Sequence, residues 1–342
     1  MKRTSKIVLI IFLTLFDGIM AQAKEAVFKN RNEEILSASF GSDTVSSEKN
    51  WGLVTLSVSN MRAKPDDASE LVSQATMGTP MKILDDQGGW CKVQTPENYT
   101  GWMDEKGLQR LDDKQLEHWK KSNRYIFNRI NGSAYSSAKR KSSQVSDLVL
   151  GDLFEVGDEV KGFLKVHFPD GRIGFVKKSD CISWSKWIGR KPDAKAVLSV
   201  ASQMAGIPYL WGGTSTKAVD CSGLTKIAYF SQGIILARDA SQQALYGQHP
   251  DFKDLRNLEP GDLLFFGRSA EHITHVGIYL GHEEYINASG FVRINSLNPG
   301  DPRYKLTERK GFVSASRILN SQNTGGIVLV KDHPWYSIIN QQ

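Results

Sequence analysis

The residues best suited to covalent chemistry in this sequence are Cys221 and a few histidines. Cys221 lies between Asp220 and Ser222, where the apolar pattern of residues 224–230 predicts the start of a buried helix. The free amides and the dipole of a helix N-terminus favour a thiolate, which is the form of cysteine that attacks a carbonyl. A cysteine that only fills a small apolar space is the alternative interpretation.

His275 is the histidine best suited to act as the base for Cys221. The alternating segment 275–280 predicts a strand with its apolar side chains on the core face and His275 on the opposite face. If the following hairpin is symmetric about Gly281, His275 faces Asn287 directly, with Cβ atoms about 5 Å apart. Asn287 then orients the imidazole and completes a predicted Cys-His-Asn triad. Two ordinary polar residues on an exposed hairpin are the alternative.

A metal hydrolase is the chief rival to this triad. His272 and His275 have the spacing of an H-x-x-H pair, and His282 lies nearby. Strand alternation points His272 and His275 to opposite faces, and no acidic metal-ligand motif accompanies them. The sequence therefore predicts a reaction that needs no metal or other cofactor.

The N-terminus has the pattern of a secretory signal peptide. Three cations precede an apolar run at 7–16, and small residues close on Ala21-Gln22-Ala23. The apolar run is short for a membrane span. We expect cleavage after Ala23, which removes residues 1–23 and leaves 24–50 as an N-terminal segment. The protein is then exported to the periplasm or cell envelope without stable membrane insertion.

Length and composition favour several soluble domains. The 342 residues exceed what one hydrophobic core usually organises. The net charge of +6 is mildly positive, and no basic run with interleaved aromatic residues indicates nucleic-acid binding. In an oxidising compartment the three cysteines leave at least one unpaired, and the sequence leaves open whether Cys91 and Cys181 form a disulfide.

Two parts of the chain repeat each other at a constant offset of 73 positions. The block Gly89-Trp90-Cys91-Lys92-Val93 matches Gly162-Phe163-Leu164-Lys165-Val166, and Gly101-Trp102-Met103 matches Gly174-Phe175-Val176. Short β-rich stretches separated by Gly, Asp and Pro turns predict a small all-β barrel in each copy. Between the copies, residues 112–124 place acidic residues before lysines and predict a linker helix.

The pattern changes to mixed helix and strand after Lys191. Pro192 and Asp193 open an apolar-periodic helix, and strands are predicted at 262–266 and 275–280. Residues 191–319 therefore form a predicted α+β domain. Residues 320–342 are a C-terminal extension with a short predicted strand at 327–330 and no assigned role.

Five ordered motifs in the α+β region resemble the NlpC family of papain-like cell-wall peptidases. They are Gly206-Ile207-Pro208-Tyr209-Leu210-Trp211-Gly212-Gly213, Asp220-Cys221-Ser222-Gly223-Leu224, Arg238-Asp239-Ala240-Ser241-Gln242, Leu258-Glu259-Pro260-Gly261-Asp262-Leu263 and His275-Val276-Gly277-Ile278-Tyr279. The two repeats, 51–111 and 125–185, resemble tandem bacterial SH3 domains. The resemblance implies a multidomain protein with two small all-β SH3-like barrels and an α+β papain-like catalytic domain. Asn287 departs from the histidine that often serves as the third polar residue in this family.

The combination of domains resembles the γ-D-glutamyl-L-diamino-acid endopeptidases, which act on peptidoglycan peptides. This implies hydrolysis of the bond between γ-D-glutamate and a diamino acid, usually meso-diaminopimelate, in peptides with a free N-terminal L-alanine. The resemblance assigns the alanine ammonium to Asp239 and Glu70, with Tyr99 and Ser222 completing the pocket. Ordinary barrel surface is the alternative for Glu70 and Tyr99.

The last motif residues with an implied role are Tyr209 and Trp211. Tyr209 resembles the oxyanion-side tyrosine of the family and stands close to Trp211 in the predicted substrate site, with packing beneath Trp211 as the alternative. We expect a monomeric cysteine peptidase that acts on peptidoglycan peptides in cell-wall turnover or recycling. A non-catalytic peptidoglycan-binding protein and an endopeptidase that cuts intact wall stems are the alternatives.

Overall fold

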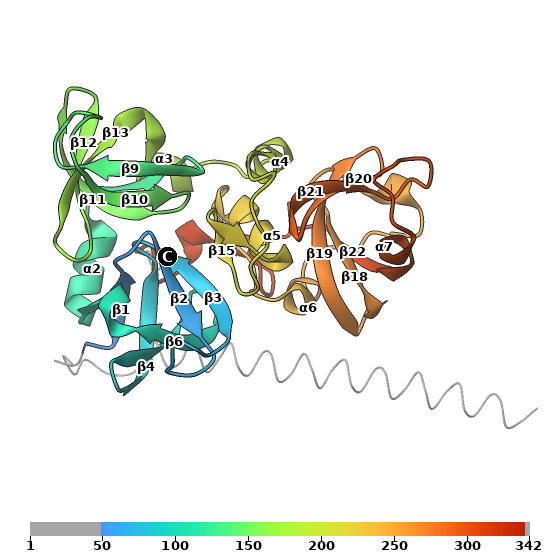
Figure 1. Ribbon diagram of the computed structural model, residues 1–342, viewed down its shortest axis with the longest axis horizontal. Helices are drawn as coiled ribbons and strands as arrows, with labels where there is room; N and C mark the ends of the chain where they lie inside the picture. The colour runs from blue at the N-terminus through green and yellow to red at the C-terminus, as the bar shows by residue number, and fades with distance from the viewer. Residues whose placement is uncertain (1–48, 339–342) are drawn as a thin grey trace, which may run out of the picture. The chain divides into compact units, whose positions relative to one another are not determined.

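The computed structural model describes residues 49–338 of the chain (Figure 1). The predicted signal peptide, 1–23, lies outside the described residues, as does the predicted N-terminal segment up to residue 48. None of the described helices is long and apolar enough to cross a membrane.

The first repeat folds into an antiparallel sheet of seven strands in the order β3-β2-β6-β5-β4-β1-β7. The strands are β1 (Trp51–Val54), β2 (Val58–Arg62), β3 (Leu71–Thr76), β4 (Pro80–Gln87), β5 (Trp90–Gln94), β6 (Thr100–Asp104) and β7 (Leu108–Leu111). Because successive strand residues face opposite sides, every second side chain enters a core that includes Met61, Met81, Val93 and Met103.

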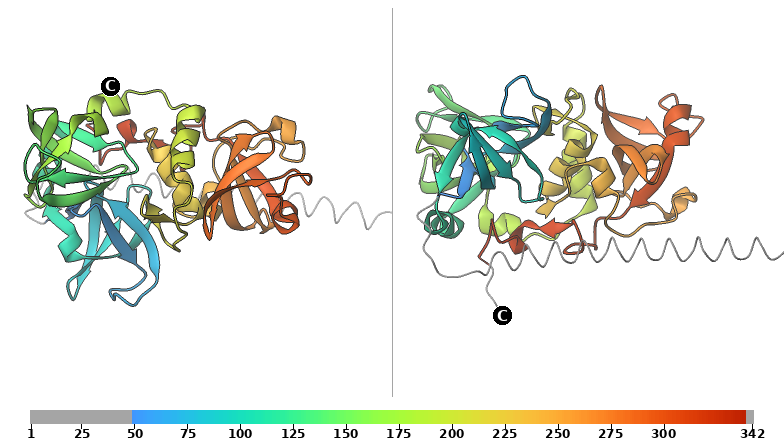
Figure 2. Two further views of the ribbon diagram at one scale, coloured as in Figure 1. Left: turned by 45° about the horizontal axis from the view of Figure 1, so that its top comes forward. Right: turned by 90° about the horizontal axis from the view of Figure 1, so that it is seen from below.

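The second repeat reproduces this arrangement strand by strand. Its strand order is β10-β9-β13-β12-β11-β8-β14, and each strand begins 73 positions after its counterpart. The strands are β8 (Arg124–Phe127), β9 (Asn131–Tyr135), β10 (Gln144–Val149), β11 (Leu153–Val160), β12 (Phe163–His167), β13 (Ile173–Lys177) and β14 (Cys181–Ser183). The internal repeat is therefore confirmed, and Figures 1 and 2 show the two sheets side by side.

The ladders leave each sheet open rather than closing it into the predicted barrel. Within residues 49–338, no strand pairing joins the edge strands β3 and β7, or β10 and β14. In the first sheet, the outer edge of β3 contacts Thr214. The amide of Gln74 donates to Thr214 Oγ1 at 3.1 Å, and that hydroxyl donates to the Gln74 carbonyl at 2.7 Å. This edge therefore docks on the C-terminal half of the chain.

A short helix connects the two sheets where a linker helix was predicted. Helix α2 (Asp113–Lys121) is capped by Asp112, whose carboxylate accepts from the Gln115 amide at 2.8 Å. The Gln115 side chain in turn accepts from the Asp112 amide at 3.0 Å, which completes a capping box. The helix buries Leu116 and Trp119 against its surroundings.

The C-terminal half combines helices with a five-stranded antiparallel sheet in the order β21-β20-β19-β18-β22. The helices are α3 (Trp184–Ile188), α4 (Ala194–Gln203), α5 (Cys221–Phe230), α6 (Ala240–Gln243) and α7 (Leu306–Gly311). The sheet strands are β18 (Leu263–Ser269), β19 (His272–Gly281), β20 (Glu284–Ser289), β21 (Phe291–Ser296) and β22 (Phe312–Ser316). Four short strands pair outside it: β15 (Thr214–Ser215) with β16 (Ala218–Val219), and β17 (Ile234–Ile235) with β23 (Val328–Leu329).

Both faces of the five-stranded sheet are covered. One face packs against α4 and α5 through a core that includes Leu224, Val276 and Ile278. A separate cluster that includes Phe266 and Tyr285 covers the strands on the side of α7 (Figure 1). The predicted core face of 275–280 is thus confirmed, and the other face is buried as well.

The C-terminal segment packs into a junction between all three parts of the fold. Tyr336 is buried in a cluster that includes Leu53 from the first sheet, Ile126 from the second and Ile235 from the C-terminal half. The Tyr336 carbonyl accepts a hydrogen bond from Arg124 Nη2 at 3.0 Å. The strand predicted at 327–330 is present as the shorter β23.

His333 makes the stability of this junction dependent on pH. Its Nε2 donates to the Pro96 carbonyl at 3.0 Å, and burial lowers its pKa from 6.5 to about 4. The unfolded chain therefore binds the proton first as the pH falls. We expect the free energy of unfolding to be unaffected by this group above pH 6.5 and to decrease by up to about 3 kcal/mol as the pH falls to 4.

Urea unfolding of the wild type and His333→Gln between pH 7 and 4 tests this expectation. Glutamine can still donate to Pro96 but does not titrate, so the variant should lose less stability over this range. Parallel pH dependences in the two proteins would contradict the assignment.

Candidate active site

Cys221 is the first residue of α5, as its sequence context predicted. The cap is Asp220, whose Oδ1 accepts from the Gly223 amide at 2.7 Å. Cys221 itself is only 8% exposed and packs with the core beneath the five-stranded sheet. The start of α5 therefore places Cys221 at the edge of the core between this helix and the five-stranded sheet.

The electrostatics of Cys221 differ from the predicted stabilised thiolate. Burial, followed by the negative charge of Asp220, raises the pKa of the thiol to about 11. Backbone groups of Val276 and Ser222 and the charge of Arg238 oppose this rise but do not cancel it. Burial thus outweighs the backbone hydrogen bonds at the start of the helix, and with a pKa of about 11 the thiol keeps its proton at neutral pH and needs a base.

His275 and Asn287 form the predicted pair. His275 Nε2 lies 3.2 Å from Asn287 Oδ1, and Asn287 is fully buried. Since the amide oxygen can only accept, Nε2 carries the proton and Nδ1 is left as the free base. Burial lowers the pKa of His275 below its ordinary value, so the imidazole is neutral at pH 7.

The register predicted for this hairpin is wrong by two residues. Asn287 lies opposite Gly277 and not opposite His275. The cause is a two-residue turn at His282 and Glu283, whose φ angles are 53° and 63°, together with an irregularity in the ladder between Tyr279 and Gly281. A shift of two residues keeps the same face, so the two side chains still meet along a diagonal.

The strand that carries His275 also contacts Cys221. The ladder between β19 and β20 ends at Gly277 and Asn287, so the next residue of β19, Val276, pairs with Phe265 of β18 but has no partner in β20. A backbone hydrogen bond from Val276 reaches the Cys221 sulfur. The cysteine therefore lies at the point where the two strands separate, beside the residue that follows His275.

Tyr209 lies close enough to Cys221 for the charge of the sulfur to affect its pKa. Burial, and then the negative charges of Cys221 and Asp220, raise the pKa of Tyr209 to about 12. Its hydroxyl thus keeps its proton at neutral pH and can donate a hydrogen bond.

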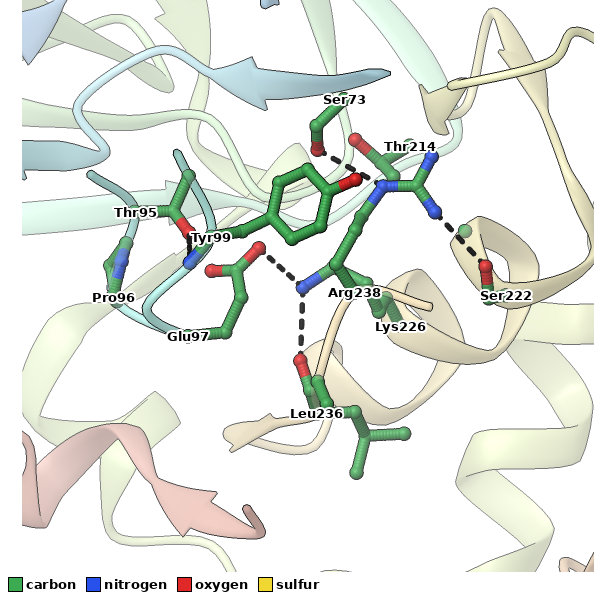
Figure 3. A network of polar contacts seen from close by, with 12 residues as sticks. Ser73, Thr95, Pro96, Glu97, Tyr99, Thr214, Ser222, Lys226, Leu236 and Arg238 are labelled. Carbon is green, nitrogen blue, oxygen red and sulfur yellow. Dashed lines mark hydrogen bonds and ion pairs between the residues drawn. The ribbon is translucent and has the colours of Figure 1, made fainter. Parts of the chain in front are cut away.

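Arg238 is the residue whose role the sequence did not reveal. It is 2% exposed, and its Nη2 lies 2.5 Å from Asp220 Oδ2. The same guanidinium donates to Ser222 Oγ at 2.9 Å and to Ser73 Oγ of the first sheet at 3.1 Å (Figure 3). Arg238 therefore holds the cap of the catalytic helix and ties it to the first sheet. Its position next to Asp239 was the only signal in the sequence.

Ser222 belongs to this network. The side chain is 4% exposed, and its hydroxyl donates to Asp220 Oδ1 at 3.1 Å while accepting from Arg238. The donor and one acceptor lone pair of the hydroxyl are thus used behind Cys221 rather than in an open pocket.

The residues assigned to amine recognition converge from both halves of the chain. Trp211 Nε1 donates to Glu70 Oε1 at 2.7 Å. The pKa of Tyr99 is raised by burial and then by the charge of Asp239, with a smaller effect from Glu70, which places the phenol among these carboxylates. Gly212 permits this approach, because its φ is 80° and a Cβ there would lie 2.3 Å from the Leu71 carbonyl oxygen.

Asp239 itself is accessible, with 45% of its side chain exposed. Burial and the charge of Asp220 raise its pKa, while Arg238, 4.0 Å away, lowers it. The two carboxylates Asp239 and Glu70 both act on Tyr99, and negative charge of this kind favours a cation.

The structure also describes the other two cysteines and the two histidines considered as metal ligands. Cys91 and Cys181 are both free thiols in the described structure, in the first and second sheet respectively, so no disulfide joins them. His272 is exposed beside Ser269, whereas His275 is half-buried next to Phe266. Within residues 49–338, no three His, Cys, Asp or Glu side chains converge in the manner of a metal site.

Comparison with known proteins gives the following similarities. Residues 206–309 match the NlpC/P60 family, and residues 57–109 match the bacterial SH3 domain. Dipeptidyl-peptidase 6 of Lysinibacillus sphaericus is 27% identical over 270 residues, covering 74% of this chain and 94% of that protein. The γ-D-glutamyl-L-lysine dipeptidyl-peptidase of Bacillus cereus is 32% identical over 256 residues, covering 68% of this chain and 73% of the relative.

A solved structure shares the fold over most of the chain. An NlpC/P60 family protein from Bacillus cereus superposes with a TM-score of 0.68 at 22% identity, covering 79% of this chain and 99% of that one.

The protonated resting thiol leads to a prediction about alkylation. If His275 is the base for Cys221, the reaction of Cys221 with iodoacetamide at pH 7 depends on His275 accepting the thiol proton. His275→Ala should therefore slow alkylation of Cys221 by at least about 100-fold, with a rate that rises toward pH 11. Peptide mass spectrometry separates Cys221 from the other two cysteines, and His272→Ala serves as the control. Equal rates in wild type and His275→Ala would refute a base role for His275.

Proposed function

Since this chain belongs to the NlpC/P60 family and is a cell-wall peptidase of the cysteine type, we propose that Cys221, His275 and Asn287 are its catalytic residues. The observation that carries this proposal is the 3.2 Å contact between His275 and Asn287 on the strand whose backbone also reaches Cys221. The Asn287 oxygen selects the tautomer with the proton on Nε2. Nδ1 then has a free lone pair, which is the state a general base requires.

The proposed reaction proceeds through a thioester. His275 Nδ1 takes the thiol proton as the Cys221 sulfur attacks the γ-carbonyl carbon of D-glutamate. The imidazolium then gives this proton to the leaving amine of the diamino acid as the amide bond breaks. Water attacks the thioester with His275 again as base, which releases the γ-carboxylate and restores the thiol.

The negative charge that forms on the carbonyl oxygen requires donors near Cys221. The amide of Cys221 stands at the start of α5, where helix amides have no partner within the helix. Tyr209 adds a hydroxyl that burial keeps protonated. We assign both groups to stabilisation of the oxyanion.

Two observations support the proposed substrate: the negative charges of Asp239 and Glu70, and the names of the relatives. Two relatives, from Bacillus cereus and Bacillus subtilis, are named γ-D-glutamyl-L-lysine dipeptidyl-peptidase. We propose that Asp239, Glu70 and Tyr99 bind the ammonium of a free N-terminal L-alanine beside Trp211, so that L-Ala-γ-D-Glu leaves a peptidoglycan peptide. The diamino acid is meso-diaminopimelate or lysine. Ser222 supports this pocket from behind through Arg238.

The domain organisation follows from the repeat. We propose that both sheets, 51–111 and 125–185, are bacterial SH3 domains joined by 112–124, and that 191–319 is an α+β papain-like domain followed by the extension 320–342. The family favours an extracellular or envelope location. We further propose export by a signal peptide at 1–23, a monomeric state, and a role in turnover or recycling of wall peptides in the periplasm.

Hydrolysis of a defined peptide tests the proposed activity. The wild type should cleave L-Ala-γ-D-Glu-meso-diaminopimelate to the dipeptide and free diaminopimelate, as followed by mass spectrometry. Cys221→Ala should lower turnover by at least about 10⁴-fold with unchanged thermal unfolding. Full activity of that variant would exclude the mechanism, whereas cleavage of stems still attached to muramic acid would indicate action on intact wall.

Asp239→Asn tests amine recognition separately from catalysis. Asparagine keeps the helix-capping capacity of the position but removes the charge. The preference for the free-amine peptide over its N-acetyl form should fall about 10- to 100-fold. Glu70→Gln, which can still accept from Trp211, should act in the same direction, and Asp251→Asn on a distant exposed loop is the control. Equal losses on both peptides would contradict the assigned role.

A further inference from the structure

The two sides of the amine-binding pocket are delivered by different segments. Tyr99 ends the loop 95–99, which joins β5 to β6 in the first sheet. Asp239 follows β17 in the C-terminal half by four residues. The distance between them is therefore set by whatever holds this loop and β17 together.

The loop is rigid within itself. Thr95 is 2% exposed, and its amide donates to the Tyr99 carbonyl at 2.8 Å. Its hydroxyl accepts from the Tyr99 amide at 3.1 Å, as Figure 3 shows. The amide of Asn98 donates to the Thr95 carbonyl at 2.9 Å. The loop thus moves as one body, and Tyr99 moves with it.

A buried ion pair joins this loop to the catalytic helix. Glu97 Oε1 lies 2.7 Å from Lys226 Nζ of α5, and the two side chains are 11% and 14% exposed. Lys226 also donates to the Leu236 carbonyl, the residue directly after β17, at 3.0 Å (Figure 3). A single ammonium therefore contacts both the loop and the segment that leads to Asp239.

The C-terminal segment 328–336 also joins β17 to the loop 95–99. Strand β23 pairs with β17, with Ile234 opposite Leu329 and Ile235 opposite Val328. Five residues beyond Val328, His333 donates from Nε2 to the Pro96 carbonyl of the loop at 3.0 Å. The segment 328–336 therefore holds one side of the pocket through a strand and the other through a histidine.

We propose that the segment 328–336, with the Glu97–Lys226 pair, is the positioning device that sets the spacing of Tyr99 and Asp239 and thereby the selectivity for a free N-terminal amine. His333 and Lys226 are positioning residues that do not touch the substrate. A charge-assisted contact depends steeply on geometry, so a small displacement of the loop lowers selectivity without altering the Cys221–His275 chemistry. This inference rests on the amine recognition proposed above.

The test compares kcat and KM for L-Ala-γ-D-Glu-meso-diaminopimelate and its N-acetyl form. His333→Ala should raise KM for the free-amine peptide on the order of 10-fold, with kcat and the N-acetyl reaction unchanged. Amide hydrogen exchange at Asn98 and Tyr99 should become faster in the same variant. His333→Gln, which can still donate to Pro96, should restore both properties, and Lys331→Ala on the exposed side of the segment should change neither.

The outcomes are distinguishable. If His333→Ala fails to fold, Glu97→Gln provides the same measurement at the other contact. Unchanged selectivity and exchange in the folded variants, or equal losses on both peptides, would overturn the positioning role. If the wild type itself does not prefer the free-amine peptide, the proposed recognition fails, and the exchange rates alone decide whether the segment holds the loop.

Discussion

The buried ion pair between Asp220 and Arg238 is the interaction on which the rest of the site depends. Asp220 caps the helix that begins at Cys221, while Arg238 precedes Asp239 and contacts Ser73 of the first sheet. Removing one partner of such a pair leaves a buried charge uncompensated, which typically costs about 3–5 kcal/mol. Cys221 at the start of α5, Asp239 and the docking of the first sheet therefore share a single electrostatic anchor.

Burial governs the chemistry as much as the architecture. It raises the pKa of Cys221 and lowers that of His275, so both groups rest in their neutral forms. In the proposed mechanism the thiol becomes reactive when His275 accepts its proton, and the low local dielectric strengthens the hydrogen bond that fixes the tautomer. The same burial lets Glu97 and Lys226 act as a fixed link between domains.

Structural features that depend on short sequence patterns were predicted correctly. The offset of 73 positions reappears in every strand of the two sheets, because equal spacing of apolar and turn residues produces equal ladders. Gly223 and the apolar residues after it placed Cys221 at a helix start. By contrast, symmetry about Gly281 predicted the right contact, between His275 and Asn287, but the wrong register, since a ladder irregularity and a two-residue turn shift the pairing without leaving a distinct sequence signal.

The sequence by itself determined the repeat, the order of the motifs and the choice of Cys221 and His275 as the proposed nucleophile and base, because these depend on residue type and short spacing. The tertiary structure alone decided that β3 docks on Thr214 instead of closing a barrel, that Cys221 rests as a thiol, and that Arg238 and the segment 328–336 hold the site together. These features depend on burial and on contacts between residues far apart in the chain, such as Pro96 and His333, which no local pattern encodes.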